Sequence, residues 1–232
     1  YSCRKTSLSD NTPSYIYINN ILFKTTIDQG SNSSKISNVW VFIDDNFIGA
    51  YELPIYFPIL KEGKHKITLK PGIKINGISK TQINYPFFEA INIDADFIKG
   101  DTIKLLNLET KYLSNVKFEL MKNFEDPDTI LFTKLHSTDT NISRVTYNVF
   151  EGKYSGKISL DNTTCSTIIV SKSNYVLHFT DTQVYLELNY KNNIPFNIGV
   201  YAYTTSSVTE REGLTVNKSD SWNKIYINLT NA

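Results

Sequence analysis

Short runs of β-branched and aromatic residues recur along the whole chain, and turn-forming residues separate them. Residues 15–18, 39–43 and 224–229 are three such runs, and Asn, Asp, Gly or Pro follows or precedes most of them. Runs of this kind, repeated roughly every 8–12 residues with turn signals between them, are typical of β-sandwiches. No long stretch has the 3.6-residue periodicity of an amphipathic helix. The chain is therefore predicted to be all-β, with antiparallel sheets.

The local patterns predict individual hairpins, strands and turns. Apolar runs at 39–43 and 47–51 flank Asp44-Asp45-Asn46, and these turn residues tolerate positive φ, so the segment predicts a β-hairpin. Pro71-Gly72 predicts a further turn, because proline lacks the N–H that a strand ladder needs. Residues 111–121 fit a helix weakly, but the alternation within 116–120 favours a strand.

Size and charge narrow the class of protein. The chain has 232 residues, of which 41% are hydrophobic and 13% aromatic, enough for one large or two small β domains. It carries 24 Lys and Arg against 23 Asp and Glu, without the concentration of positive charge that nucleic-acid binding requires. We therefore expect no nucleic-acid partner. No run of about 18 apolar residues predicts a membrane-spanning helix.

The domain organisation follows from the spacing of the strand runs. Residues 1–13 are polar and predict a flexible tether. A boundary between about 108 and 123 divides the rest into a small β-sandwich over residues 14–110 and a second sandwich over residues 111–232.

The chain has two cysteines, Cys3 and Cys165. Cys165 lies in a strand-like run and is expected to be a buried free thiol. Cys3 follows a small residue and precedes Arg4, Lys5 and a polar segment that ends at Pro13, an arrangement that resembles the junction of a bacterial lipoprotein. The resemblance implies acylation of Cys3, and each buried methylene of an acyl chain contributes about 0.8 kcal/mol to anchoring. The alternative is a terminal cysteine without a function.

The first module resembles the small β domains of Bacteroidetes envelope lipoproteins, and part of it is similar to the PEGA-type repeat of bacterial surface proteins. The similarity is carried by 39–44, 48–54, 62–65 and Tyr85-Pro86-Phe87. It implies an outer-membrane location. Asp101-Thr102-Ile103 and Asp128-Thr129-Ile130 resemble the O-glycosylation acceptor of the same bacteria, which implies glycosylation of Thr102 and Thr129.

The second module resembles the galactose-binding-like jelly roll of many carbohydrate-binding modules. The similarity is carried by Phe124-Glu125-Asp126, 151–158 and 222–227. It implies a structural calcium ion with Glu125 and Asp220 among its oxygen ligands. Solvated turns are the alternative explanation of these two acidic residues, and no other cofactor is expected.

The sequence contains no enzyme motif that we recognise. His65, His136 and His178 lack metal-ligand spacing, and the chain has neither a nucleophile elbow nor a phosphate-binding glycine motif. A pair of carboxylates for glycan hydrolysis remains as an alternative, since such a pair forms only in the fold. We expect a protein that is not an enzyme.

Three aromatic residues are candidates for contact with a ligand. Tyr201 and Tyr203 alternate with aliphatic residues, and Trp222 lies near the last strand. They predict a platform for a sugar ring or an anchor for a protein partner, with core packing as the alternative.

These features together predict a non-catalytic, lipid-anchored outer-membrane accessory protein, a structural or interaction subunit of a larger membrane protein assembly. The first alternative is a carbohydrate-binding surface lipoprotein, and the second is a glycan hydrolase. The side of the outer membrane on which the protein lies is left open.

Overall fold

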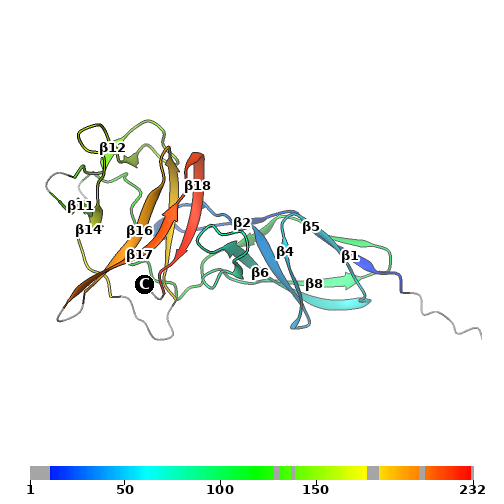
Figure 1. The fold of residues 1–232 in the computed structure, drawn as a ribbon. Coiled ribbons are helices and arrows are strands. Elements are labelled where there is room, and N and C mark those ends of the chain that lie inside the picture. The colour runs from blue at the N-terminus through cyan, green and yellow to red at the C-terminus, as the bar shows by residue number, and fades with distance from the viewer. Residues whose placement is uncertain (1–10, 128–130, 137–138, 177–182, 204–206, 231–232) are drawn as a thin grey trace, which may run out of the picture. The chain divides into compact units, whose positions relative to one another are not determined.

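The computed structural model describes residues 11–127, 131–136, 139–176, 183–203 and 207–230 (Figure 1). The chain divides into two compact units. The first comprises Tyr1–Lys24 and Asn32–Val116, and the second comprises Thr25–Ser31 and Lys117–Ala232. The all-β class is confirmed, because the described residues form strands and a single 3-10 helix, η1 (Ile27–Gln29), without an α-helix.

The first unit contains ten strands in its described part, arranged as the three groups β5-β1-β9, β10-β2 and β4-β3-β6-β7, with β8 also paired to β6. The strands are β1 (Ser14–Ile18), β2 (Ile21–Phe23), β3 (Asn38–Ile43), β4 (Asn46–Glu52), β5 (Ile55–Ile59), β6 (Gly63–Lys74), β7 (Gln82–Asn84), β8 (Ile91–Phe97), β9 (Thr102–Leu105) and β10 (Leu108–Thr110).

The core of the first unit lies between two layers of strands. Alternate residues of β1 and β5, among them Ile16 and Phe57, point to the same buried cluster as Val41 of β3 and Leu69 of β6. This period-two burial is what the alternating pattern of the sequence predicts for a sandwich.

Two strand pairs in the first unit are parallel rather than antiparallel. β1 pairs with β9, and β2 pairs with β10. The two pairs have the same register offset, and a short break separates β1 from β2 and β9 from β10. Parallel neighbours need a long crossover connection, and β3 to β8 supply it here. The β5-β1-β9 sheet is therefore mixed and the β10-β2 pair is parallel, whereas the sequence predicted antiparallel sheets, because pairing between such distant strands has no local signal.

The β3–β4 hairpin is confirmed. Its strands pair in antiparallel register from Asn38 to Ile43, and Asp44 and Asp45 form the turn with φ values of 50° and 63°. Both residues occupy the left-handed region, as a two-residue hairpin turn with positive φ at both central positions requires.

The prediction of a turn at Pro71-Gly72 was wrong, since β6 continues through both residues. Pro71 lies where β6 exchanges one partner, β8, for another, β7, so its missing N–H falls between the two ladders. Gly72 fits because a Cβ atom there would overlap the side chain of Asn38 and lie 2.6 Å from the carbonyl oxygen of Ile83.

The second unit consists of four antiparallel two-stranded pairs in its described part: β11-β14, β12-β13, β15-β18 and β16-β17. The strands are β11 (Phe132–Lys134), β12 (Ser143–Val145), β13 (Ser155–Lys157), β14 (Ile169–Ser171), β15 (Tyr185–Asn192), β16 (Phe196–Tyr203), β17 (Val208–Val216) and β18 (Ser219–Asn228). The jelly-roll order of strands stays a prediction.

A small core joins the four longest strands of the second unit. Val216, Ile225 and Ile227 are buried, and partly buried residues of β15 and β16 pack against them, including Leu186 and Ile198. The two long ribbons, β15-β18 and β16-β17, therefore pack against each other through one face each.

The strand predicted at 116–120 was wrong. These residues carry no strand, and the backbone N–H of Val116 donates to the carbonyl oxygen of Leu113 in a turn instead. The turn satisfies the N–H of Val116 locally, without the neighbouring strand that the predicted element would need.

Candidate functional site

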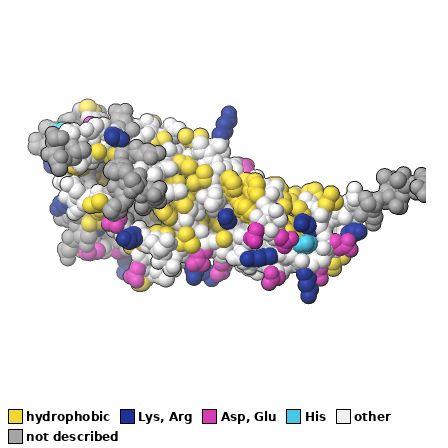
Figure 2. Space-filling view, turned by 90° about the horizontal axis from the view of Figure 1, so that it is seen from below, with side chains coloured by type: hydrophobic (Ala, Val, Ile, Leu, Met, Phe, Trp, Pro, Cys, Tyr) yellow, Lys and Arg dark blue, Asp and Glu magenta, His cyan; other side chains and the backbone are white. Residues whose placement is uncertain are grey.

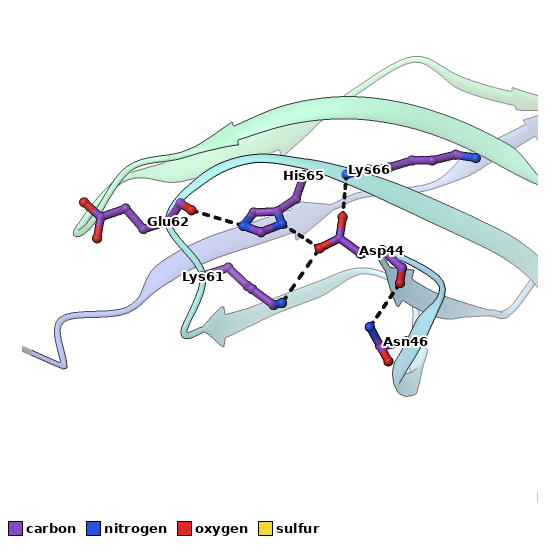
Figure 3. Close-up of polar contacts among 6 residues, drawn as sticks. All are labelled: Asp44, Asn46, Lys61, Glu62, His65 and Lys66. Atoms are coloured by element: carbon purple, nitrogen blue, oxygen red, sulfur yellow. Dashed lines mark hydrogen bonds and ion pairs between the residues drawn. The ribbon is translucent and has the colours of Figure 1, made fainter.

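The most connected group of charged side chains that the structure describes is centred on Asp44, in the turn between β3 and β4 (Figure 3). Asp44 Oδ2 lies 2.6 Å from His65 Nδ1 and 3.8 Å from Lys61 Nζ. Asp44 Oδ1 accepts the backbone N–H of Lys66 at 3.1 Å, and the Asn46 side chain donates to the Asp44 carbonyl oxygen at 3.0 Å. The cluster thus joins the β3–β4 turn to the start of β6.

Both ring nitrogens of His65 are engaged in this cluster. Nδ1 faces the Asp44 carboxylate, and Nε2 lies 3.1 Å from the carbonyl oxygen of Glu62. Both partners are acceptors, so each contact is a hydrogen bond where the facing ring nitrogen carries a proton. A general base needs a free ring nitrogen facing its substrate, and in this arrangement the histidine instead fastens two turns together.

The pKa of the Asp44 carboxyl group is lowered from its ordinary value of 3.8. The largest cause is the hydrogen bond from the backbone N–H of Lys66, and the hydrogen bond with His65 comes next. Partial removal of water opposes this effect, and the charges of His65 and Lys61 reinforce it. The cluster therefore favours the ionised carboxylate in the folded state.

We expect Asp44→Asn to lower the urea midpoint of the first unit at pH 6 and to have little effect near pH 2. Because the folded-state pKa is depressed, the contribution of Asp44 is fully present above its unfolded pKa and is lost as pH falls through the folded value. Urea unfolding at both pH values measures the difference. Asp45→Asn, in the same turn, is the matched control. If Asp44→Asn lowered the urea midpoint as much at pH 2 as at pH 6, the proposed role of the Asp44 charge would be contradicted.

Glu125, a predicted calcium ligand, stabilises a turn of the second unit. Its Oε1 accepts the backbone N–H groups of Lys153 and Tyr154 at 2.9 and 3.0 Å. Arg144 donates to the carbonyl oxygens of Phe124 and Glu125 at 2.6 and 2.7 Å, and its guanidinium carbon lies 3.1 Å from the centre of the Tyr154 ring. These contacts tie the segment at 124–125 to β12 and to the turn before β13.

Asp220, the other predicted ligand, has a different partner. Its Oδ1 lies 3.0 Å from Lys218 Nζ on the surface of β18. Within the residues that the structure describes, three or more His, Cys, Asp and Glu side chains nowhere gather into a metal-binding group. Calcium binding at Glu125 and Asp220 stays a prediction.

The predicted modification sites are placed only in part. Cys3 and Thr129 lie outside the described residues. Thr102 is half-buried in β9, and its Oγ1 lies 3.5 Å from the Tyr56 hydroxyl. Cys165 is free and exposed, so the expectation of a buried thiol was wrong. The reason is that β14 begins only at Ile169, and Cys165 belongs to the preceding loop.

Tyr201 and Tyr203 lie on one face of β16, as the alternation of the sequence predicts. Tyr203 is 60% exposed, and it pairs across the ribbon with Val208, which is 58% exposed. Tyr201 pairs with Glu210 of β17. Partial burial raises the pKa of the Tyr201 hydroxyl, and so do the charge of Glu210 and a hydrogen bond with its carboxylate.

Trp222 does not share the surface of the two tyrosines. On β18 it alternates with the core residues Ile225 and Ile227, and its ring packs 5.4 Å from the ring of Phe150. Tyr201 alternates in the same way with Ile198, which packs against that core. The tyrosines and Trp222 therefore point away from the core on different ribbons.

A second aromatic surface, which was not among those predicted from the sequence, lies on the outer side of the β5-β1-β9 sheet. We call it the tyrosine face. Its residues alternate with buried ones along the three strands and at the next position beyond β5 and β9. They are Tyr15, Tyr17, Tyr56, Pro58, Leu60, Thr102, Lys104 and Leu106.

The tyrosine face is partly exposed and largely apolar. Tyr56 is 54% exposed, Leu60 68% and Leu106 55%. The rings of Tyr15 and Tyr56 stack with their centres 5.0 Å apart and their planes 7° apart. Figure 2 shows one side of the molecule, where hydrophobic side chains gather over part of the first unit beside acidic and basic ones. The alternation of Tyr15 and Tyr17 with isoleucines is the signal that the sequence offered for this surface.

No family model, curated protein or solved structure matches the chain. The resemblances to envelope lipoproteins and to carbohydrate-binding jelly rolls therefore stay predictions from the sequence. In the described part of the chain, no helix has the length and hydrophobicity needed to span a bilayer.

Proposed function

We propose that this protein is a non-catalytic, lipid-anchored outer-membrane accessory protein that works as an interaction subunit of a larger membrane protein assembly. Cys3, followed by a polar segment that ends at Pro13, supports the anchor. The observation that carries the interaction role is the exposed end of the β16-β17 ribbon, where Tyr203 and Val208 face each other across the strands.

This cross-strand pair has the chemistry of a contact surface. Tyrosine is enriched at protein interfaces, because its ring buries apolar area while its hydroxyl group still forms hydrogen bonds. The exposed apolar groups at the end of this two-stranded ribbon form a small area. Burying that area against a partner is favourable.

The test is isolation of a tagged native copy in mild detergent. We expect a co-isolated membrane protein whose recovery falls at least about tenfold in the Tyr203→Ser, Val208→Ser double variant, as is usual for loss of an aromatic anchor. Thr215→Ser, on the same ribbon, is the control and should retain the partner. Isolation of the native protein alone would count against the interaction role.

Mass spectrometry of the native protein tests the anchor separately. We expect acyl chains on Cys3 and loss of membrane association in Cys3→Ala. An unmodified Cys3 thiol on a protein found in the aqueous fraction would remove the anchor from the proposal.

Carbohydrate binding is the second candidate, and the pairing of Tyr201 with Glu210 favours it. An aromatic ring beside a carboxylate offers both a stacking surface and a hydrogen-bond acceptor for sugar hydroxyl groups. We expect a glycan array to show binding that Tyr201→Ala and Tyr203→Ala each reduce, while Tyr147→Ala, an exposed tyrosine elsewhere in the same unit, leaves it unchanged. An array without signal would eliminate this candidate.

A further inference from the structure

The tyrosine face of the first unit has an unusual composition for the outer side of a sandwich layer. The solvent-facing side of a sheet that is buried on its other side is normally polar, yet this face carries three tyrosines, a proline and two leucines. Lys104 is its charged member, and Thr102 is the other polar one. Glu109, beyond the end of β9, is paired with Lys24 at 2.7 Å.

We propose that the tyrosine face is a membrane-docking surface that lies on the headgroup region of a bilayer. Tyrosine is enriched at membrane–water interfaces, because the ring sits among the acyl chain ends while the hydroxyl group stays hydrated. Leu60 and Leu106, at opposite ends of the face, are exposed enough to insert. Lys104 supplies attraction to anionic headgroups.

The short stretch of chain between Cys3 and β1 favours a lipid surface over other occupants of the tyrosine face. β1, the central strand of this sheet, begins at Ser14, so the chain between Cys3 and the face is short. At about 3.3–3.6 Å per residue it spans at most roughly 40 Å. If Cys3 carries the proposed anchor, the face is held within that distance of the bilayer. The docking chemistry of the face itself does not require the anchor.

The ring geometry argues against a sugar ligand at this face. Tyr15 and Tyr56 stack ring against ring, which covers the facing surface of each ring and so removes one of the two surfaces on which a sugar ring could lie. Their hydroxyl groups and ring edges stay available for contact, and these suit a hydrated headgroup region. The experiment below distinguishes a bilayer from a protein partner or a second copy of the chain as the occupant of the tyrosine face.

The experiment uses the full-length Cys3→Ser protein, so that no acyl chain contributes. We expect it to co-sediment with vesicles of phosphatidylethanolamine and phosphatidylglycerol. The Leu60→Ser, Leu106→Ser double variant should lower the vesicle partition coefficient at least about tenfold, because both side chains lose the apolar burial. Lys104→Gln should lower it about fivefold on these anionic vesicles and leave binding to phosphatidylcholine vesicles unchanged.

The control is the Phe47→Ser, Ile78→Ser double variant, which removes two exposed hydrophobic side chains away from the tyrosine face, one on β4 and one in the turn between β6 and β7 of the same unit. It should bind vesicles like the parent. The proposal is overturned if the parent does not co-sediment, if the control pair loses as much binding as the Leu60 and Leu106 pair, or if the face instead forms a dimer that these leucines stabilise. Because Cys3 is absent, failure here is distinct from failure of the anchor, which mass spectrometry reports.

Discussion

Replacing Leu69 with alanine is expected to lower the free energy of unfolding of the first unit by about 2–5 kcal/mol. Leu69 is fully buried on β6, between Val41 of β3 and Ile91 of β8. The smaller side chain removes apolar contacts from both neighbours and leaves a cavity, because paired strands cannot move together to fill it.

The two tryptophans make this measurement specific to one unit. Trp40 lies in the first unit and Trp222 in the second. In a Trp222→Phe background, urea unfolding followed by Trp40 fluorescence reports the first unit. Leu60→Ala, the same chemical change at an exposed position of that unit, should shift stability by no more than about 0.5 kcal/mol. Equal effects of the two substitutions would contradict the two-layer core.

Replacing Ile227 with alanine is expected to destabilise the second unit by about 2–5 kcal/mol and to leave the first unit unchanged. Ile227 is buried on β18 opposite Leu186 of β15, in the core between the two long ribbons. That core has three buried members among the described residues, so each one accounts for a large share of the packing. The variant brings this unit close to its stability limit.

Trp222 fluorescence in a Trp40→Phe background follows the second unit in the same assay. Ile194→Ala, at an exposed position between β15 and β16, is the control and should leave the transition in place. We expect the Trp40 signal of Ile227→Ala, measured in the Trp222→Phe background, to match that of the parent. A shift of both transitions together would show that the two units unfold as one.

Part of the candidate surfaces could be read from alternation alone. Tyr201 and Tyr203 are two residues apart in a run of strand-forming residues, so their common face was predictable, and the structure places them on it. Tyr15 and Tyr17 show the same spacing. Tyr56 lies beside them only because β5 pairs with β1, and no sequence pattern near Tyr56 predicts that pairing.

The strand β17 shows where local reasoning fails. Its Glu210-Arg211-Glu212-Gly213 segment has low strand propensity, and the sequence analysis predicted no strand there. It pairs with β16 along its whole length, with an irregularity at Gly213. Glu210 and Arg211 point to opposite faces of the ribbon, but both are exposed, so their charges stay in water. The partner strand, rather than propensity, decided the conformation.

Local sequence patterns were enough to predict the all-β class, the positions of the most apolar strands and the β3–β4 turn. These depend on side-chain alternation and on which residues tolerate positive φ, and both are properties of neighbouring residues. The parallel pairing of β1 with β9, the contact of Asp44 with His65 and the assembly of the tyrosine face became visible only in the folded chain. Each depends on residues distant in the chain, whose approach is set by the packing of the whole unit around its core.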